Sequence, residues 1–184
     1  MRIVAGKWKG RRLVVPPSTV RPTADKVREA WMSIVHMMLP NATVLDLCAG
    51  SGALGIEALS RGARHATFVE TSEKVITTLK ENIAHVGAGE LSTVVRDNAV
   101  SFIEPLAAGS FDIAFADPPY KSNTARSVAE RWLKSPFSGL LGVEHSWSDT
   151  MPPGGETRRY GSSAITFYRV GEPPTPPAPP APSP

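Results

Sequence analysis

The sequence predicts an α/β protein with a doubly wound, mostly parallel sheet of seven strands in the Rossmann-like arrangement. Two observations support this fold class. Apolar segments of strand length alternate with segments of helical periodicity from residue 43 to residue 145. A glycine loop with G-x-G-x-x-G spacing, Gly50–Gly55, lies between the first such strand and the next helix. We also expect a basic β-hairpin extension at the N-terminus.

The N-terminal segment contains two predicted elements. Residues 2–15 alternate loosely between apolar and polar positions, which indicates a short hairpin that Pro16 and Pro17 end. Residues 23–38 are expected to form a helix that Thr23 can cap. The apolar residues of that segment recur at helical spacing, namely at Val27, Trp31, Ile34, Val35 and Met38.

The later elements alternate as in a parallel α/β sheet. Residues 43–48 form a continuous apolar run, which is typical of a strand buried on both faces. Further strands are expected at 66–70, 91–96, 111–116 and 139–145, with helices at 53–61, 73–86, 99–106 and 123–134. Residues 157–160 and 164–170 flank a Gly-Ser-Ser turn and predict a closing hairpin.

Chain length and composition limit the domain organisation. With 184 residues, 41% of them apolar, the chain has room for one domain with an ordinary core. We expect a basic hairpin or arm at 1–20, the α/β domain at 21–171 and a disordered tail at 172–184. The tail is rich in proline, so it favours extended polyproline-type conformations and cannot pack a core.

Composition also argues against several protein classes. The longest apolar stretches are too short to span a bilayer, and the N-terminus lacks an apolar signal region, so we expect a cytoplasmic monomer without a membrane partner. Cys48 is the single cysteine, which excludes an internal disulfide. The four histidines are far apart in the sequence and lack cysteine partners, so no metal site is expected.

Charge is distributed unevenly along the chain. Residues 1–28 carry eight Lys/Arg residues and one acid, whereas the rest of the chain is net acidic. A basic arm on an acidic body is typical of polyanion binding, and Trp8 adds a ring that can stack on a base or, alternatively, pack the hairpin onto the helix around Trp31. The alternative is a basic but merely solvated N-terminus. The residues expected to bind nucleic acid are Arg2, Lys7, Trp8, Lys9, Arg11, Arg12, Arg21 and Arg28.

The glycine loop predicts a nucleotide-like cofactor. Glu70 ends the second strand, where an acid binds the ribose hydroxyls in this type of motif. Taken alone, the loop fits NAD or FAD. Asp46 favours a different cofactor, because an acid inside an apolar strand is suited to hold a positive group such as the ammonium of S-adenosylmethionine. Alternatively, Asp46 caps the turn through backbone N–H groups, and the two roles are compatible.

The tetrapeptide Asp117-Pro118-Pro119-Tyr120 follows the predicted strand 111–116. Each proline fixes φ and lacks an N–H, so the turn is rigid and its carbonyl groups point outward. An acceptor-lined turn that ends in an aromatic ring suits the conjugated amino group of a flat base. The alternative is a turn after a strand with no chemical role.

With both motifs, the sequence resembles the class I S-adenosylmethionine-dependent methyltransferases. More narrowly, it resembles the RsmD-type family, which methylates the exocyclic N2 of one guanine in bacterial small-subunit (16S) ribosomal RNA. The resemblance covers residues 1–170, and its matching segments are 2–11, 21–29, 45–63, 117–120, 159–161 and 166–168. The chain departs from the family pattern at 146–156, which is short and rich in Pro and Gly, and at 161–163, which lacks an expected acid.

The resemblance implies roles for individual residues. Asp46, Gly50 and Gly52 would hold the amino-acid part of S-adenosylmethionine, Glu70 its ribose, and either Asn98 or Asp97 its adenine. The full expected cofactor-binding set is Asp46, Gly50, Ser51, Gly52, Glu70, Asn98 and Asp117. The expected catalytic residues are Asp117, Pro118 and Tyr120. Arg21 would lie in a loop near cofactor and RNA, and the implied partner is ribosomal RNA or the assembling small subunit.

The chemistry of methyl transfer to a base is consistent with these roles. An arylamine is a poor nucleophile because its lone pair is delocalised into the ring. Asp117 and the Pro118 carbonyl can accept its two N–H groups and direct the lone pair at the methyl, while Tyr120 stacks on the extruded base. Such orientation can contribute on the order of 7–11 kcal/mol, and an anion near the developing positive charge adds stabilisation.

Other functions fit the same residues less well. Adenine-N6 nucleic-acid methyltransferases share Asp-Pro-Pro-Tyr, but usually carry a recognition domain for which this chain has no room. Protein glutamine methyltransferases favour Asn at the position of Asp117. A noncatalytic RNA-binding assembly factor is disfavoured by the intact Asp117 and Glu70, and a nicotinamide oxidoreductase gives no reason for Asp-Pro-Pro-Tyr.

Overall fold

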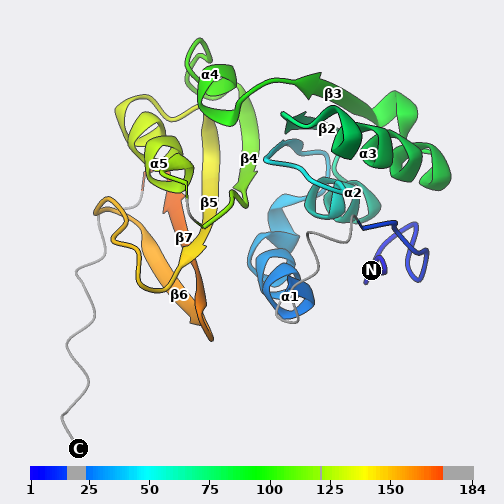
Figure 1. Ribbon diagram of the computed structural model, residues 1–184, viewed down its shortest axis with the longest axis horizontal. Coiled ribbons are helices and arrows are strands. Elements are labelled where there is room, and N and C mark those ends of the chain that lie inside the picture. The colour runs from blue at the N-terminus through cyan, green and yellow to red at the C-terminus, as the bar shows by residue number, and fades with distance from the viewer. Residues whose placement is uncertain (16–23, 121, 172–184) are drawn as a thin grey trace, which may run out of the picture.

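The structure is a computed structural model that describes residues 1–15, 24–120 and 122–171, with the side chains of residues 24–26 excepted (Figure 1). The predicted proline-rich tail at 172–184 and Arg21 lie outside the described residues. No helix in the described part is long and apolar enough to cross a membrane.

The fold is built on one sheet of seven strands in the order β3-β2-β1-β4-β5-β7-β6. The central strands are parallel, and β7 is antiparallel to both β5 and β6. The strands are β1 Thr43–Leu47, β2 His65–Glu70, β3 Ser92–Arg96, β4 Phe111–Ala116, β5 Ser138–Ser146, β6 Glu156–Tyr160 and β7 Ser163–Arg169. The predicted doubly wound, mostly parallel sheet is therefore confirmed.

Helices cover both faces of the sheet, as Figure 1 shows. The helices are α1 Ala24–Val35, α2 Ala53–Ser60, α3 Glu73–Val86, α4 Ala99–Ile103 and α5 Thr124–Lys134, with short 3₁₀ turns at His36–Met38 and Gly89–Leu91. Residues of α1, α2 and α3 form one hydrophobic cluster with the sheet, and residues of α4 and α5 form a second cluster on the opposite face.

Alternation along the strands explains the two clusters. In β4, Ile113 and Phe115 belong to the α1 side, whereas Ala114 and Ala116 belong to the α5 side. Successive side chains of a strand point to opposite faces, so continuous apolar runs fill both clusters at once. On the α1 side, the Trp31 ring meets Phe115 and Phe167 edge-on, at centroid distances of 5.1 and 5.7 Å.

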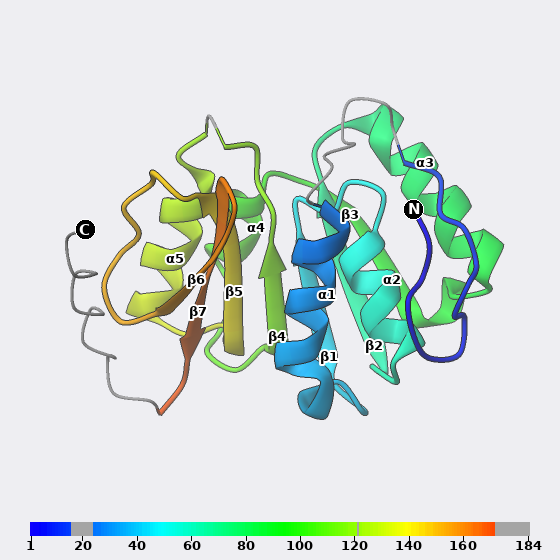
Figure 2. The same ribbon diagram turned by 90° about the horizontal axis from the view of Figure 1, so that it is seen from below.

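The predicted N-terminal β-hairpin is not confirmed. Arg2 and Arg12 form an isolated antiparallel bridge, and the Ile3 amide donates to the Arg11 carbonyl (3.0 Å), but neither segment is a regular strand. Instead, the arm of residues 1–15 runs beside α2 and α3 (Figure 2). The arm is therefore attached mainly by its contacts with helices.

Two side chains of α2 hold this arm. Glu57 is 1% exposed, and its carboxylate accepts the backbone N–H groups of Val4 (2.8 Å) and Ala5 (3.0 Å). The Ser60 hydroxyl accepts the Trp8 amide at 3.0 Å and donates to the Ala5 carbonyl at 2.6 Å. Since side-chain acceptors satisfy these backbone donors, the arm needs no neighbouring strand.

The arm also contributes to the hydrophobic core. Ile3, Trp8 and Leu13 are buried in the cluster on the α1 side. Trp8 is only 3% exposed, so its predicted role as a ring that stacks on nucleic acid does not fit this structure. The Lys7 ammonium lies 5.6 Å from the centre of the Trp8 ring, at the surface above it. The basic side chains of the arm are therefore exposed, whereas the Trp8 ring is buried and stabilises the fold.

Candidate functional site

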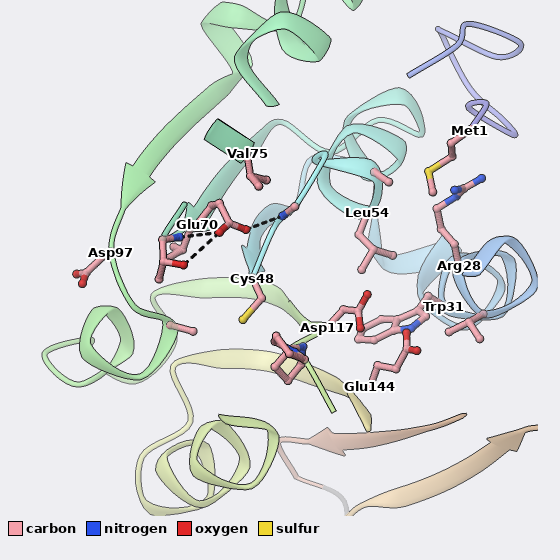
Figure 3. A pocket seen from close by; sticks show the side chains of 18 residues that line it. Met1, Arg28, Trp31, Cys48, Leu54, Glu70, Val75, Asp97, Asp117 and Glu144 are labelled. Atoms are coloured by element: carbon pink, nitrogen blue, oxygen red, sulfur yellow. Dashed lines mark hydrogen bonds between the residues drawn. The ribbon is translucent and has the colours of Figure 1, made fainter. Parts of the chain in front are cut away.

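A cavity of about 370 Å³ opens at the carboxyl ends of the parallel strands (Figure 3). This edge is where doubly wound folds bind ligands, because the loops leave a crevice there. The lining comes from the glycine loop, the ends of β2, β4 and β5, helix α1 and the N-terminus. Among the lining residues are Met1, Arg28, Trp31, Cys48, Gly50, Leu54, Glu70, Val75, Asp97, Asp117, Pro118 and Glu144.

The glycine loop brings backbone close to the cavity. Gly50 and Gly52 have φ values of 55° and 80°, in the left-handed region that glycine adopts without strain. A Cβ on Gly52 would lie 2.4 Å from the Leu79 side chain, and one on Gly55 would lie 2.3 Å from the Phe68 ring. The loop therefore packs α2 tightly on the sheet. Gly50 lines the cavity, whereas Ser51 and Gly52 lie behind it.

Glu70 links the loop to the second strand. Its Oε2 accepts the Gly50 amide at 3.0 Å, and its Oε1 accepts the amides of Thr71 (2.8 Å) and Ser72 (2.9 Å). Figure 3 shows the bonds from Glu70 to Gly50 and Thr71 at the wall of the cavity. Glu70 thus lies where the sequence motif predicts a ribose-binding acid, with its carboxylate fixed by backbone donors.

Asp46 lies behind the cavity wall. Its side chain is 2% exposed, and its Oδ2 accepts the Gly55 amide at 2.9 Å in the first turn of α2. Burial raises the pKa of Asp46 to about 8, and the nearby charges of Asp117 and Glu70 act in the same direction against the Gly55 bond. The Asp46 side chain therefore bonds a backbone N–H group, as the alternative interpretation of this residue expected. Asp46 is not among the residues that line the cavity.

The two residues proposed for adenine have different surroundings. Asp97 lines the cavity. The Asn98 side chain instead caps α4, because its Oδ1 accepts the amides of Val100 (2.9 Å) and Ser101 (3.4 Å). The geometry favours Asp97 as the residue that faces a ligand and makes Asn98 a helix cap.

The Asp-Pro-Pro-Tyr turn begins where β4 ends. Asp117 is exposed and lines the cavity together with Pro118 and Pro119. The Tyr120 hydroxyl donates to Glu144 Oε1 at 2.7 Å and makes a short hydrogen bond with the Ser163 hydroxyl. The phenol end of Tyr120 is therefore anchored to the adjoining strands β5 and β7.

Several lining residues were not expected from the sequence. Arg28 was assigned to nucleic acid, but it is 6% exposed and its Nη2 donates to the Arg2 carbonyl at 3.0 Å. It therefore lines the cavity. Trp31 forms a buried wall, and Glu144 brings a further carboxylate from β5. The sequence signal for Glu144 is an acid at the end of the apolar run Leu140-Leu141-Gly142-Val143.

Cys48 lines the cavity below the glycine loop. Its φ is 59°, which is rare for a residue with a side chain and marks the sharp turn after β1. Burial, with the nearby Glu70, Asp117 and Asp46 charges, raises the pKa of the Cys48 thiol to about 12. Cys48 is therefore a neutral wall residue and not a nucleophile at neutral pH.

The electrostatics of the cavity favour a ligand with positive charge. Among the described residues, four lining side chains are carboxylic acids, namely Glu70, Asp97, Asp117 and Glu144, and one is the arginine Arg28. No group of three or more His, Cys, Asp or Glu residues with a metal-binding arrangement occurs in the described part of the chain. Apolar walls from Leu54, Val69 and Val75 complete the lining.

Comparison with known proteins gives consistent relatives. The chain is 43% identical over 122 residues to ribosomal RNA small subunit methyltransferase D of Escherichia coli, covering 66% of this chain and 61% of that protein. It is 37% identical over 152 residues to the protein of the same name from Haemophilus influenzae, covering 78% of each. The matched segment thus spans about three fifths of the Escherichia coli protein.

Solved structures show the same architecture. An Escherichia coli protein described as a candidate methyltransferase, yhhF, superposes with a TM-score of 0.80 at 35% identity, covering 92% of this chain and 97% of its own. A Thermus thermophilus hypothetical protein also gives a TM-score of 0.80, at 32% identity and with 92% and 99% coverage.

A family model described as "Conserved hypothetical protein 95" matches residues 1–169, which include both the arm and every strand of the sheet. The chain therefore belongs to this family, the RsmD family, as its sequence motifs predicted.

Proposed function

We propose that this protein transfers a methyl group from S-adenosylmethionine to the exocyclic N2 of a guanine in small-subunit ribosomal RNA. The observation that carries the proposal is that Glu70 and the Asp-Pro-Pro turn, assigned separately to cofactor and target amine, line one cavity. The relatives from Escherichia coli and Haemophilus influenzae carry names that specify ribosomal RNA small subunit methylation. Ribosomal RNA, free or in the assembling subunit, is accordingly the proposed partner.

The residues of the cavity fit S-adenosylmethionine. Gly50 offers close backbone approach, Glu70 suits a ribose diol, and the carboxylates of the lining suit an ammonium and a sulfonium. Asp46 lies behind the wall. A cation in the cavity would stabilise the ionised form of Asp46, because it would offset the repulsion from Asp117 and Glu70. When bound, S-adenosylmethionine supplies an electrophilic methyl group.

The chain's own residues orient the amine. Asp117 and the Pro118 carbonyl accept the two N–H groups of the guanine amino group, which directs its lone pair towards the cofactor side of the cavity. Asp117 also stabilises positive charge that develops on the nitrogen. No strong base is required, because an alkylated arylammonium is acidic enough to lose its proton to water. Tyr120, held by its hydroxyl, keeps its ring beside the turn for stacking on the base.

The proposed RNA surface is the exposed charge of the N-terminal arm. Arg2, Lys7, Lys9, Arg11 and Arg12 are exposed, and the Arg11 guanidinium donates to the His85 carbonyl at 3.2 Å. The arm is bonded to α2, so these charges keep a fixed position on the molecule, and Arg2 and Arg12 lie beside Met1, which lines the cavity. Fixed cations near a catalytic cavity attract and orient a polyanion.

One pair of measurements tests this proposal. Calorimetry should detect S-adenosylmethionine binding by the wild-type protein and by Asp117→Ala with at most a small loss of affinity in the variant, because Glu70 and Asp97 keep their carboxylates in the lining. Transfer of labelled methyl to small-subunit ribosomal RNA or its assembly intermediates should occur only with the wild type. Binding of NADH without binding of S-adenosylmethionine would exclude the proposed chemistry. Near-normal turnover by Asp117→Ala would reduce the Asp-Pro-Pro-Tyr turn to a structural role.

A further inference from the structure

Guanine and adenine differ in the polarity of the ring nitrogen N1. Guanine N1 carries a hydrogen and donates, whereas adenine N1 has a lone pair and accepts. A group that contacts this atom therefore distinguishes the two bases, and enzymes that extrude a base read its Watson–Crick edge with such contacts. If the function proposed above holds, the cavity needs an acceptor beside Asp117 for guanine N1–H.

Glu144 has the required place in the sheet. Strands β4 and β5 are parallel neighbours, and their register pairs Ala116 with Val143 at its end. The next residues along the two strands are Asp117 and Glu144. Ala116 and Val143 both pack on the α5 side, so alternation directs Asp117 and Glu144 to the α1 side. Adjacent strands lie roughly 4.8 Å apart, so the two carboxylates are neighbours at the cavity.

Figure 3 shows Asp117 and Glu144 in the same part of the cavity, next to the Trp31 ring. Trp31 packs closely over Gly142, where a Cβ would lie 2.5 Å from the ring, so the floor between the two strands is filled. Asp117 and Glu144 both line the cavity, as Trp31 does.

The Glu144 carboxylate is also held in place. Glu144 is 7% exposed and lines the cavity, and its Oε1 accepts the Tyr120 hydroxyl at 2.7 Å. The same hydroxyl contacts Ser163 on β7, the antiparallel neighbour of β5. An ionised carboxylate has about four acceptor positions on its two oxygens, so the phenol does not prevent it from accepting from a base. Tyr120 thus connects the stacking turn to the orientation of Glu144.

We propose that Glu144 selects guanine by accepting its N1–H, while Asp117 and the Pro118 carbonyl accept from the N2 amino group. The inference rests on the proposed function and adds the residue that determines the base. Adenine in this position would bring its N1 lone pair against the Glu144 carboxylate, and because it lacks a 2-amino group it would leave Asp117 and the Pro118 carbonyl without a hydrogen. A cavity with acceptors in these places discriminates against adenine by repulsion as well as by lost bonds.

The test compares two bases at the methylated position, which is first located by mass spectrometry. Small-subunit particles are reconstituted with RNA that carries guanine or 2-aminopurine there. 2-Aminopurine keeps the 2-amino group but has an unprotonated, accepting N1. The wild type should prefer guanine strongly in kcat/KM. Glu144→Gln should lower this preference by roughly tenfold to a hundredfold, the scale of one hydrogen bond to a charged group, because the glutamine amide can donate to N1.

Two controls make the comparison specific. Glu70→Gln, the matched change at the other side of the cavity, should weaken S-adenosylmethionine binding without altering the guanine preference. Glu144→Gln should still bind S-adenosylmethionine, with at most a small loss of affinity because the other lining carboxylates remain, and this binding also reports that the variant is folded. Tyr120→Phe, which keeps Glu144 but removes the phenol bond, should lower the preference to a smaller extent. This variant tests the orientation of Glu144 even if Glu144→Gln does not fold.

The outcomes separate this inference from the proposed function. Methylation of guanine by the wild type, with the same base preference in Glu144→Gln and Tyr120→Phe, would overturn the role of Glu144 alone. Methylation of neither RNA by the wild type would overturn the proposed function, and the inference with it. Inosine, which lacks the 2-amino group, should accept no methyl group from any variant, and methylation of inosine would exclude N2 as the target.

Discussion

The Glu57 side chain holds the N-terminal arm, and its removal should destabilise the docking of the arm on α2. The carboxylate is buried and accepts the Val4 and Ala5 amides, while Arg61 one turn later donates to Oε1 at 2.8 Å. Glu57→Ala deletes both acceptors. The two backbone donors then lose their partners in a region that already contains the buried Ile3 and Trp8 side chains.

The expected loss follows from these contacts. A buried donor left without a partner costs about 1–3 kcal/mol, so two donors set a range of about 2–6 kcal/mol. Val4 and Ala5 are only half-buried, which lets water reach them and places the loss at the lower end. Removing the buried charge also recovers its desolvation cost, and Arg61 can turn to solvent. We therefore expect Glu57→Ala to lower the free energy of unfolding by about 2–3 kcal/mol.

Urea denaturation followed by circular dichroism measures this loss. With an m-value of about 2 kcal/mol/M, the midpoint should fall by roughly 1–1.5 M. The matched control is Glu130→Ala, which removes an exposed partner of Arg126 one turn away on α5 and should cost at most about 0.5 kcal/mol. Equal midpoints for the Glu57 and Glu130 variants would refute the conclusion that the arm is docked through Glu57.

Three further predictions concern charge. Asp46 has a folded pKa of about 8, above its unfolded value, so the folded state binds the extra proton and stability should fall as pH rises from about 4 to 8. Asp46→Asn should remove that decline, on the order of a few kcal/mol; parallel pH profiles of urea midpoints for the two proteins would contradict it. Replacing exposed Lys9, Arg11 and Arg12 with glutamine should flatten the dependence of log K for RNA on log salt, by roughly 0.7–0.9 per lost phosphate contact, with S-adenosylmethionine affinity as the control. The Cys48 thiol, with a pKa of about 12, should react with iodoacetamide at pH 8 far more slowly than free cysteine, and rapid alkylation in the folded protein would refute its neutral state.

The sheet was predictable because its signals are local. Strands such as Thr43–Leu47 and Phe111–Ala116 are continuous apolar runs, and each is followed by a turn of glycine or proline. The helix expected at 73–86 is observed as α3, and the Ser72 hydroxyl caps it by accepting the Val75 amide at 3.4 Å. The same local logic correctly associated Glu70 and Asp117 with one edge of the sheet.

The docking of the N-terminal arm was not predicted, because the contacts that hold it are distant in sequence. Alternation in residues 2–15 suggested a hairpin, but the acceptors that hold the arm lie on α2, more than fifty residues later. Trp8 between two lysines looked like an exposed ring, and it is buried because this docking covers it. A chain segment's exposure depends on what packs over it, and that information is absent from local pattern.

At the cavity, it was easier to predict which residues lie nearby than to predict where their side chains point. Asp46 and Asn98 are at the expected positions in the chain, yet both side chains bond the first turns of helices instead of lining the cavity. In the sequence, Arg28 was grouped with the basic residues of the N-terminal segment. In the structure, helix α1 directs its side chain inward, and it is buried. Glu144 was missed, although an acid ending an apolar strand is the pattern that drew attention to Glu70.

The proposed function requires that this protein methylates guanine N2 in small-subunit ribosomal RNA and needs Asp117 to do so. The most direct measurement is mass spectrometry of nucleosides from the small-subunit RNA of a strain that lacks the gene. Supplying the wild-type gene should restore one N2-methylguanosine per small subunit, and supplying Asp117→Ala at equal protein level should restore none. Restoration by Asp117→Ala, or an N2-methylguanosine content that never depends on the gene, would contradict the account.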